Sequence, residues 1–273
     1  MEELMRNKPI LNESLLQQAL LVAKTAALKA EEVIKSYYQD NELKTHIKND
    51  QTPVTIADKE SEQIIRAEIK AHFPEHDIFG EEFGLTDHAD NHEKSDYLWL
   101  IDPIDGTKSF VRQYPFFSTQ IALMYRGELV VGVSNAPIFE ELAWAVVGNG
   151  AFLNDQAIHI ATEFAAHSSC VSTGNIQSLV NKNWQKLGHL LTKFSKIRGY
   201  GDFYHYHLLA SGKIDLIIES NVNVLDIAAL SVIVKEAGGK ITDLNGEPIG
   251  LDTVSILAGT EFTHALGLKT LNE

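Results

Sequence analysis

The chain has 273 residues, of which 44% are hydrophobic, a formal net charge of −14 and a single cysteine, Cys170. This composition predicts a globular protein with one large domain or two closely packed ones, and no stretch is apolar enough to span a membrane. The negative charge disfavours a nucleic-acid partner. The lone cysteine and an acidic N-terminus without an apolar signal core together predict a cytoplasmic protein.

The first half is expected to begin with two helices. Apolar residues recur every three or four positions from Asn12 to about Gln39, which predicts a long amphipathic helix. A second helix is expected from about Ala57 to His72, and Pro74 prevents its continuation. The polar stretch Lys44–Thr55 between them is expected to be a loop. Strands are predicted at Tyr97–Ile101, Thr119–Tyr125, Leu129–Ser134 and Glu141–Val147, the last three as an antiparallel meander.

After about Gly150 the pattern changes to alternating strands and helices. Strands are predicted at Cys170–Thr173, Ile214–Glu219, Lys240–Thr242 and Ser255–Ala258. Helices are predicted at Ile176–Phe194, Phe203–Ser211 and Asp226–Ala237, the last ended by two glycines. The simplest arrangement is two halves, residues 1–150 and 151–273, packed as one compact α+β unit.

The most informative segment is LIDPIDGTKSF, which begins at Leu100. A buried strand would bring Asp102 to its C-terminal edge, and Asp105 would follow on the same rigid turn. Two carboxylates held together in this way can bind a hard cation such as Mg²⁺, and the carbonyl of Ile104 is a further oxygen ligand. Either aspartate alone would be typical of an ordinary turn, so it is the whole segment that indicates a metal site.

The residues after this turn suit a phosphate. Gly106 would let the backbone approach a ligand closely. The N–H groups that follow Asp105, together with the hydroxyl of Thr107, would hold a phosphate if a helix begins there.

Three more carboxylates are candidates for the same site. Glu81 lies in the segment GEEFG just upstream of the predicted strand, Asp58 lies at the start of the second helix, and Asp226 opens a later helix. Taken singly, each has a simpler reading: a solvated loop for Glu81 and a helix cap for the two aspartates.

Together, the segments GEE at 80–82, DPIDGT at 102–107 and DIAA at 226–229 resemble the signature of the inositol monophosphatase family of metal-dependent phosphatases. The resemblance extends from about residue 15 to 260. It implies a layered α-β-α-β-α sandwich, usually a homodimer, that hydrolyses a small phosphate monoester with two or three Mg²⁺ ions. The implied metal ligands are Glu81, Asp102, the carbonyl of Ile104, Asp105 and Asp226. The implied catalytic residues, which activate or support the attacking water, are Glu81, Thr107 and Asp58.

Further segments are similar to the histidinol-phosphatase branch of this family. They are RGYGD at 198–202, LLASG at 208–212 and the pair Lys108 and Ser109. The resemblance implies L-histidinol phosphate as substrate and a late step of histidine biosynthesis as the role. The predicted substrate-binding residues are Asp105, Gly106, Thr107, Asp202 and Glu219. The last two acids would suit a leaving group that carries an ammonium, although Asp202 would equally suit a helix cap.

Three alternatives stay open. The substrate could be inositol monophosphate, or the 3′-phosphate of an adenosine bisphosphate, which would need an adenine site that the sequence does not reveal. From another class, the chain could be a non-catalytic metal-binding regulatory protein. His205 and His207 are spaced as a metal pair would be on a strand, but they fall in a predicted helix and are expected to be ordinary helix residues.

Overall fold

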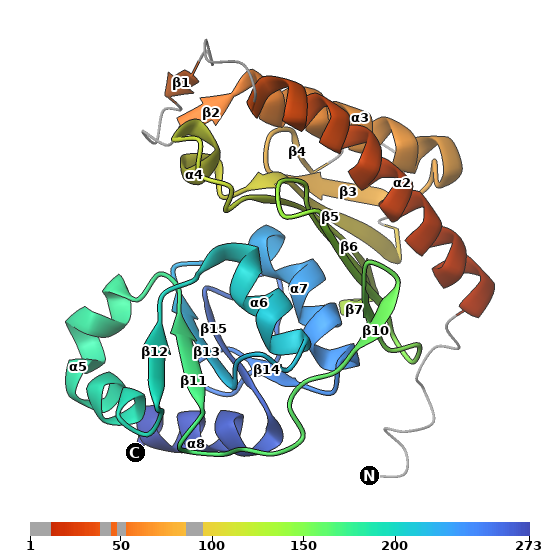
Figure 1. Cartoon of the computed structure of the whole chain (residues 1–273). Helices are drawn as coiled ribbons and strands as arrows, with labels where there is room; N and C mark the ends of the chain where they lie inside the picture. Colours follow the sequence, from red (N-terminus) through yellow and green to blue (C-terminus); the bar gives the residue numbers. More distant parts are fainter. Residues whose placement is uncertain (1–11, 39–44, 48–52, 86–94) are drawn as a thin grey trace.

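The computed structural model describes residues 12–38, 45–47, 53–85 and 95–273. Helices and sheets alternate in five layers, as Figure 1 shows from top to bottom. The first layer is α2 (Glu13–Tyr38) and α3 (Ile56–His72). The eight-stranded sheet beneath it has the order β10 (Gln156–Ile158), β9 (Ala151–Leu153), β8 (Glu141–Val146), β7 (Glu128–Ala136), β6 (Ser118–Tyr125), β5 (Tyr97–Asp105), β3 (Asp77–Gly80) and β4 (Gly84–Leu85).

The second half of the sandwich completes the five layers. The central helices are α6 (Asp202–Ala210) and α7 (Val224–Glu236). The five-stranded sheet has the order β12 (Lys196–Arg198), β11 (Cys170–Thr173), β13 (Leu216–Ser220), β15 (Ser255–Gly259) and β14 (Lys240–Thr242). The outer layer is α5 (Gln177–Leu191) and α8 (Glu261–Asn272). The predicted α-β-α-β-α sandwich is therefore confirmed.

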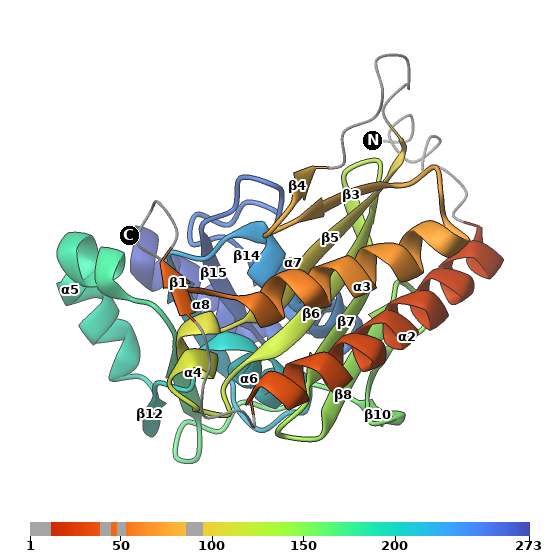
Figure 2. The same cartoon turned by 90° about the horizontal axis from the view of Figure 1, so that it is seen from above.

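The first helical layer follows from the apolar stripe of α2. Its buried face is rich in alanine, and Asn12 caps its start by accepting the Leu15 N–H through Oδ1 at 3.3 Å. Figure 2 shows α2 and α3 side by side across the strands of the large sheet. The predicted loop at Lys44–Thr55 is wrong where the structure describes it, because β1 (Thr45–Ile47) pairs with β2 (Pro53–Thr55). The predicted end of the first helix at Gln39 and the N-terminal segment 1–11 lie outside the described residues.

The large sheet contains the expected meander. Strands β6, β7 and β8 pair antiparallel in sequence, and Arg126 and Gly127 connect the first two with φ of 49° and 86°. Two positive φ values in a two-residue loop match the twist of the strands that it joins. The parallel pairing of β3 with β5 was not predicted, because the four residues of β3 are too few to show a period.

Helix α7 lies between the two sheets and is apolar on all sides. Ten of its residues are buried, and it packs against β6, β7 and β8 on one face and α6 and β14 on others. A helix that is hydrophobic all round belongs in an interior, and this position explains the pattern. Its backbone approaches β7 so closely that a Cβ at Gly132 would lie 2.3 Å from the Ala229 carbonyl oxygen. This close packing of α7 on the large sheet fixes the position of its N-terminus, which carries Asp226, next to the end of β5.

In the second half, strand β12 was not predicted, and two helices differ from the prediction. The expected helix at Ile176–Phe194 is shorter and is interrupted at Asn183, where φ is −138° and ψ is 34°. The C-terminal helix α8 was not predicted, although Thr260 and Thr263 form a capping box at its start. Within the described residues, no helix is both long and apolar enough to cross a membrane.

Candidate metal and phosphate site

The strand β5 ends in a turn that presents Asp102 and Asp105. The pairing of β5 with β6 shifts register between these two residues, so the chain bulges there. The Ile104 N–H donates to Asp102 Oδ1 at 3.0 Å, and the Thr107 hydroxyl donates to the Ile104 carbonyl at 3.1 Å. These bonds hold the turn in one shape. The helix that the sequence analysis required after the turn is present as α4 (Thr107–Val111), one turn and a half long.

Gly106 is required at its position for two reasons. Its φ is 89°, a backbone angle that residues with a side chain rarely adopt. A Cβ there would also lie 2.6 Å from the carbonyl oxygen of Phe116. The glycine is therefore demanded by the turn itself, independently of the predicted contact with a ligand.

Asp226 reaches the same place from the opposite layer. The helix α7 begins two residues earlier than predicted, with Asn223 as its cap and Asp226 in its first turn. The Asn223 N–H donates to Asp226 Oδ2 at 2.9 Å, which orients the carboxylate. One oxygen each from Asp102, Asp105 and Asp226 lies within 4.8 Å of the others. Segments more than a hundred residues apart thus meet at one point.

The loop that carries Glu81 is held by a buried ion pair on α3. Glu62 is fully buried and accepts the Glu82 N–H at 2.7 Å, while Arg66 Nε donates to it at 2.7 Å. Arg66 also donates to the carbonyl of Gly84 at the far end of the loop. A Cβ at Gly80 would lie 2.1 Å from Glu62 Oε1, so a larger residue there would displace the Glu62 carboxylate. The spacing of Glu62 and Arg66 by four residues was visible in the sequence, but the loop contact was not.

Burial and the charges of neighbouring acids raise the pKa values of the carboxylates in this cluster. Burial first, and then the charge of Glu81, raise the pKa of Asp102 well above its usual range; the charges of Asp105, Asp226 and Asp58 add to this. The pKa of Asp105 is raised in the same way, and burial raises that of Asp226 to about 6.

This donor set fits a hard divalent cation. Within the described residues, no lysine or arginine forms an ion pair with Asp102, Asp105 or Asp226. Buried like charges repel unless something positive lies between them. All the donors are oxygens, as Mg²⁺ prefers, so the arrangement favours a bound metal over a purely structural cluster.

A second pair of acids lies beside the first. Asp202 and Glu219 line a cavity of about 40 Å³ together with Asp105 and Asp226. Asp202 has a φ of 47° and makes no cap hydrogen bond with α6, so the cap reading of this residue is not supported. Burial first and then the charge of Glu219 raise the pKa of Asp202 to about 6.

Glu219, in contrast, already has partners within the protein. Its Oε2 lies 3.1 Å from His205 Nε2 and accepts the Tyr206 hydroxyl at 2.9 Å. Burial alone would raise the pKa of Glu219, but the charge and hydrogen bond of His205 and the bond from Tyr206 lower it on balance. Asn175, which was not predicted from the sequence, also lines the cavity. Its backbone N–H donates to Glu219 Oε1 at 3.4 Å.

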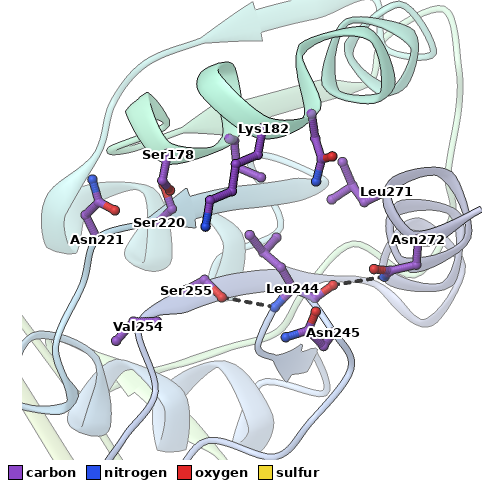
Figure 3. A pocket seen from close by; sticks show the side chains of 12 residues that line it. Ser178, Lys182, Ser220, Asn221, Leu244, Asn245, Val254, Ser255, Leu271 and Asn272 are labelled. Carbon is purple, nitrogen blue, oxygen red and sulfur yellow. Dashed lines mark hydrogen bonds between the residues drawn. The ribbon is translucent and has the colours of Figure 1, made fainter.

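A larger groove lies away from these acids, between α5, α8 and the ends of β13 and β15. It has a volume of about 310 Å³, and none of the described residues that line it is acidic. Figure 3 shows Lys182 extending into it from α5, opposite Leu244 and Ser255. The groove therefore offers no carboxylate ligand for a metal.

Comparison with known proteins identifies the family of the chain. The model of the inositol monophosphatase family matches residues 15–273. A histidinol-phosphatase of Mycobacterium tuberculosis is 34% identical over 233 residues, which cover 83% of this chain and 88% of that protein. Nus factor SuhB of Pasteurella multocida is 36% identical over 232 residues, 83% of this chain and 85% of that protein. The solved structure of an inositol monophosphatase from Anabaena superposes with a TM-score of 0.78 at 31% identity, covering 94% of this chain and 96% of that one.

These matches confirm two predictions made from the sequence. The fold is that of the family, and the predicted enzyme class, a magnesium-dependent phosphoric monoester hydrolase, is the class to which the family belongs. The chain belongs to the inositol monophosphatase family.

Proposed function

We propose that the chain hydrolyses L-histidinol phosphate to L-histidinol and phosphate, as a step of histidine biosynthesis. The observation that carries the catalytic part is the convergence of Asp102, Asp105 and Asp226 within 4.8 Å, at the end of β5 and the start of α7. The histidinol part is supported by the similarity to the mycobacterial histidinol-phosphatase and by an acidic cavity beside the cluster.

In this proposal five groups hold two or three Mg²⁺ ions. They are the carboxylates of Glu81, Asp102, Asp105 and Asp226 and the carbonyl of Ile104. Bound Mg²⁺ supplies charge that makes water a nucleophile at neutral pH and stabilises the phosphoryl and leaving oxygens. Asp58, on α3, contributes its charge to the same cluster, since it raises the pKa of Asp102.

The remaining roles belong to the chain's own groups. Glu81 accepts a proton from the attacking water. Thr107 orients that water through its hydroxyl oxygen, while the hydroxyl donates its hydrogen bond to the Ile104 carbonyl at 3.1 Å. The backbone at Gly106 and Thr107 holds the phosphoryl group in line with the water, so positioning contributes much of the rate enhancement.

The leaving group is proposed to lie over Asp202 and Glu219. Histidinol phosphate carries an ammonium next to its ester, whereas inositol phosphate presents hydroxyls. Asp202 has no hydrogen-bond or ion-pair partner among the described residues, so it is available to accept from that ammonium. Glu219, held by His205 and Tyr206, forms the wall beside it.

A phosphate-release assay tests the proposal. The purified chain is incubated with histidinol phosphate, inositol monophosphate and adenosine 3′,5′-bisphosphate, each with Mg²⁺, with Ca²⁺ and with excess chelator. We expect histidinol phosphate to have the highest kcat/KM, Ca²⁺ not to replace Mg²⁺, and the chelator to abolish turnover. A preference for inositol phosphate would overturn the substrate assignment alone. No turnover of any ester by folded, Mg²⁺-binding protein would favour the regulatory alternative.

Two further parts of the proposal concern the whole protein. A homodimer is proposed from the family resemblance, and a cytoplasmic location from the single cysteine, Cys170. Light scattering coupled to size-exclusion chromatography would give about 60 kDa for the dimer, against the 30.3 kDa of one chain.

A further inference from the structure

A chain of hydrogen bonds runs from Asp105 into the interior of the large sheet. The Ser118 hydroxyl donates to Asp105 Oδ2 at 3.5 Å, which is the longest hydrogen bond in this network. Gln120 Nε2 then lies 2.7 Å from Ser118 Oγ and 3.0 Å from Ser134 Oγ. Asp105 faces Ser118, and Gln120 faces Ser134, as direct partners across neighbouring strands. Cross-strand partners have adjacent side chains, so the register itself brings these groups together.

The same chain continues into the central helical layer. Ser134 Oγ lies 2.9 Å from Nε2 of His207 on α6, and the Nδ1 of that ring lies 2.8 Å from Glu141 Oε2 at the start of β8. Ser118, Gln120, Ser134 and His207 are each at most 2% exposed. Only Glu141, whose side chain is 20% exposed, reaches solvent. The chain therefore links the carboxylate cluster to the surface through buried groups.

The chemistry of the end groups sets the direction of several hydrogen bonds in this network. A carboxylate only accepts, so His207 donates from Nδ1 to Glu141, and its Nε2 pairs with the Ser134 hydroxyl. Gln120 donates from one nitrogen to both serines, which turns the Ser118 hydroxyl proton towards Asp105. If the Gln120 amide were turned the other way, two buried N–H groups would have no acceptor. In the observed orientation, only the Gln120 Oε1 acceptor has no partner within the described residues.

Ser134, His207 and Glu141 have the order of a serine hydrolase triad, but they cannot act as one. Ser134 is fully buried, and its hydroxyl already lies between Gln120 and His207. A nucleophile must meet its substrate, and no substrate can reach this oxygen. The three residues therefore serve the carboxylate at the other end of the chain.

We propose that Gln120 and His207 are positioning residues, which hold the Asp105 carboxylate in the orientation that binds the cation. They act through the two serines and touch neither metal nor substrate. Buried hydrogen bonds in a low dielectric restrict the groups that they join, and groups that orient metal ligands commonly change metal affinity by about 10- to 100-fold. The inference rests on the proposed function, because it takes Asp105 to be a metal ligand.

Metal affinity, measured by calorimetric titration of Mg²⁺ into folded protein, tests this role without relying on activity. We expect Gln120→Met and Ser118→Ala each to weaken Mg²⁺ binding by about tenfold. The variant that combines Gln120→Met and Ser118→Ala should bind Mg²⁺ about as weakly as either single variant, because both substitutions interrupt the same series of hydrogen bonds. His207→Leu should weaken binding by about threefold, and His207→Gln, which keeps one donor and one acceptor, should restore most of it.

His264→Gln is the matched control. His264 is also a buried helix histidine, 7% exposed, and its Nε2 bonds to the Thr242 hydroxyl at 2.9 Å, far from the cluster. Its Mg²⁺ affinity should stay within about twofold of wild type. If Gln120→Met and Ser118→Ala lower the melting temperature but bind Mg²⁺ like wild type, the chain serves only the fold and the proposal is wrong. If Gln120→Met does not fold, Ser118→Ala decides alone. A wild-type protein that binds no Mg²⁺ would instead refute the proposed function.

Discussion

Buried carboxylates in this molecule fall into two groups that differ in how their charge is compensated. Glu62 is fully buried, yet it has an arginine and two backbone N–H groups of the 81–84 loop as partners. Asp102, Asp105 and Asp226 lie close together, and burial and the charges of neighbouring acids raise their pKa values. An acid that the protein compensates is structural, whereas acids that it leaves uncompensated require a cation from outside. The difference distinguishes the scaffold from the site.

The largest effect is expected from removing one charge of the uncompensated group. Asp105→Asn keeps the shape of the side chain but removes a metal ligand, so kcat/KM should fall by at least about a thousand-fold, which corresponds to about 4 kcal/mol of transition-state stabilisation. Phosphate release at limiting Mg²⁺ measures this. Asp215→Asn is the control, because Asp215 accepts the Cys170 N–H at 2.7 Å at the opposite end of β13.

The same variant also tests the sign of the electrostatics. In chelator, Asp105→Asn should be more stable than wild type by about 1 kcal/mol, since it relieves repulsion among buried carboxylates. Mg²⁺ should then raise the melting temperature of the wild type but hardly that of the variant. A folded variant that retains near-wild-type turnover would refute the metal assignment.

The compensated group should respond in the opposite way, through stability. Glu62→Gln leaves Arg66 without its carboxylate and should lower the free energy of unfolding by about 3 kcal/mol, the usual result of removing one partner of a buried pair. Urea denaturation with and without Mg²⁺ measures it. The control is Glu68→Gln on the same helix, whose partner Lys29 has a side chain that is 55% exposed; its loss should be below about 1 kcal/mol. Equal losses in the two variants would contradict the structural role of Glu62.

The sequence predicted the parts of the site that a short local pattern encodes, and it did not predict contacts between distant segments. The Asp102–Asp105 turn was predicted because strand, proline and glycine are all adjacent in sequence, and α2 because its apolar stripe is long. The contacts of Glu62 with the 81–84 loop, and of Gln120 with Ser134, depend on packing and register across distant segments, which no single segment encodes. Asp226 was placed near a helix start, but the capping role fell to Asn223, since side chains there compete for similar bonds.

Short elements were missed for a related reason. Strands β3, β4, β9, β10 and β12 have two to four residues each, too few for a period of two to be recognised. The polar stretch 45–55 pairs as β1 and β2 despite a composition typical of a loop. Helix α8 has only a weak apolar stripe, because few of its residues are buried.

A buried group can also avoid the need for compensation by staying neutral, and His76 illustrates this. Its ring stacks between Phe73 and Tyr97, and its Nδ1 accepts the Trp99 indole N–H at 3.1 Å. Burial first, and then the charge of Lys70, lower its pKa from an ordinary 6.5 to about 4, against the opposing charge of Asp77.

The pH dependence of stability follows from this pKa. Above pH 6.5 the ring is neutral in both states and contributes nothing; as the pH falls towards 4, the unfolded state is protonated first and stability is lost. The loss attributable to His76 should be about 2.5 kcal/mol at pH 4.5, because one pKa unit corresponds to about 1.4 kcal/mol. His76→Gln keeps an acceptor for Trp99 but cannot titrate, so denaturation between pH 7 and 4.5 should show a shallower slope. The same slope in His76→Gln as in the exposed-site variant His159→Gln would refute the assignment.

The smallest expected effect concerns substrate choice. The acidic cavity also contains one acid with protein partners, Glu219, and one without any among the described residues, Asp202. Glu219 is held by His205 and Tyr206, whereas Asp202 has no such partner among the described residues and adopts a φ of 47°, which asparagine also tolerates. Asp202→Asn should therefore fold normally and lower kcat/KM for histidinol phosphate by about tenfold, the value of one charge-assisted hydrogen bond of roughly 1.5 kcal/mol. Turnover of p-nitrophenyl phosphate, which has no ammonium, should change less than about twofold, because the metal ligands are untouched.

Glu219→Gln provides the contrast within the same cavity. It disturbs the bonds to His205 and Tyr206 and should reduce both activities in parallel, together with stability, since a partnered acid supports the fold as well as the cavity wall. If Asp202→Asn also lowers the two activities equally, Asp202 supports the site rather than selecting the substrate. The acidic cavity would then be explained by the electrostatics of the metal cluster next to it, and the ammonium of the substrate would need another acceptor.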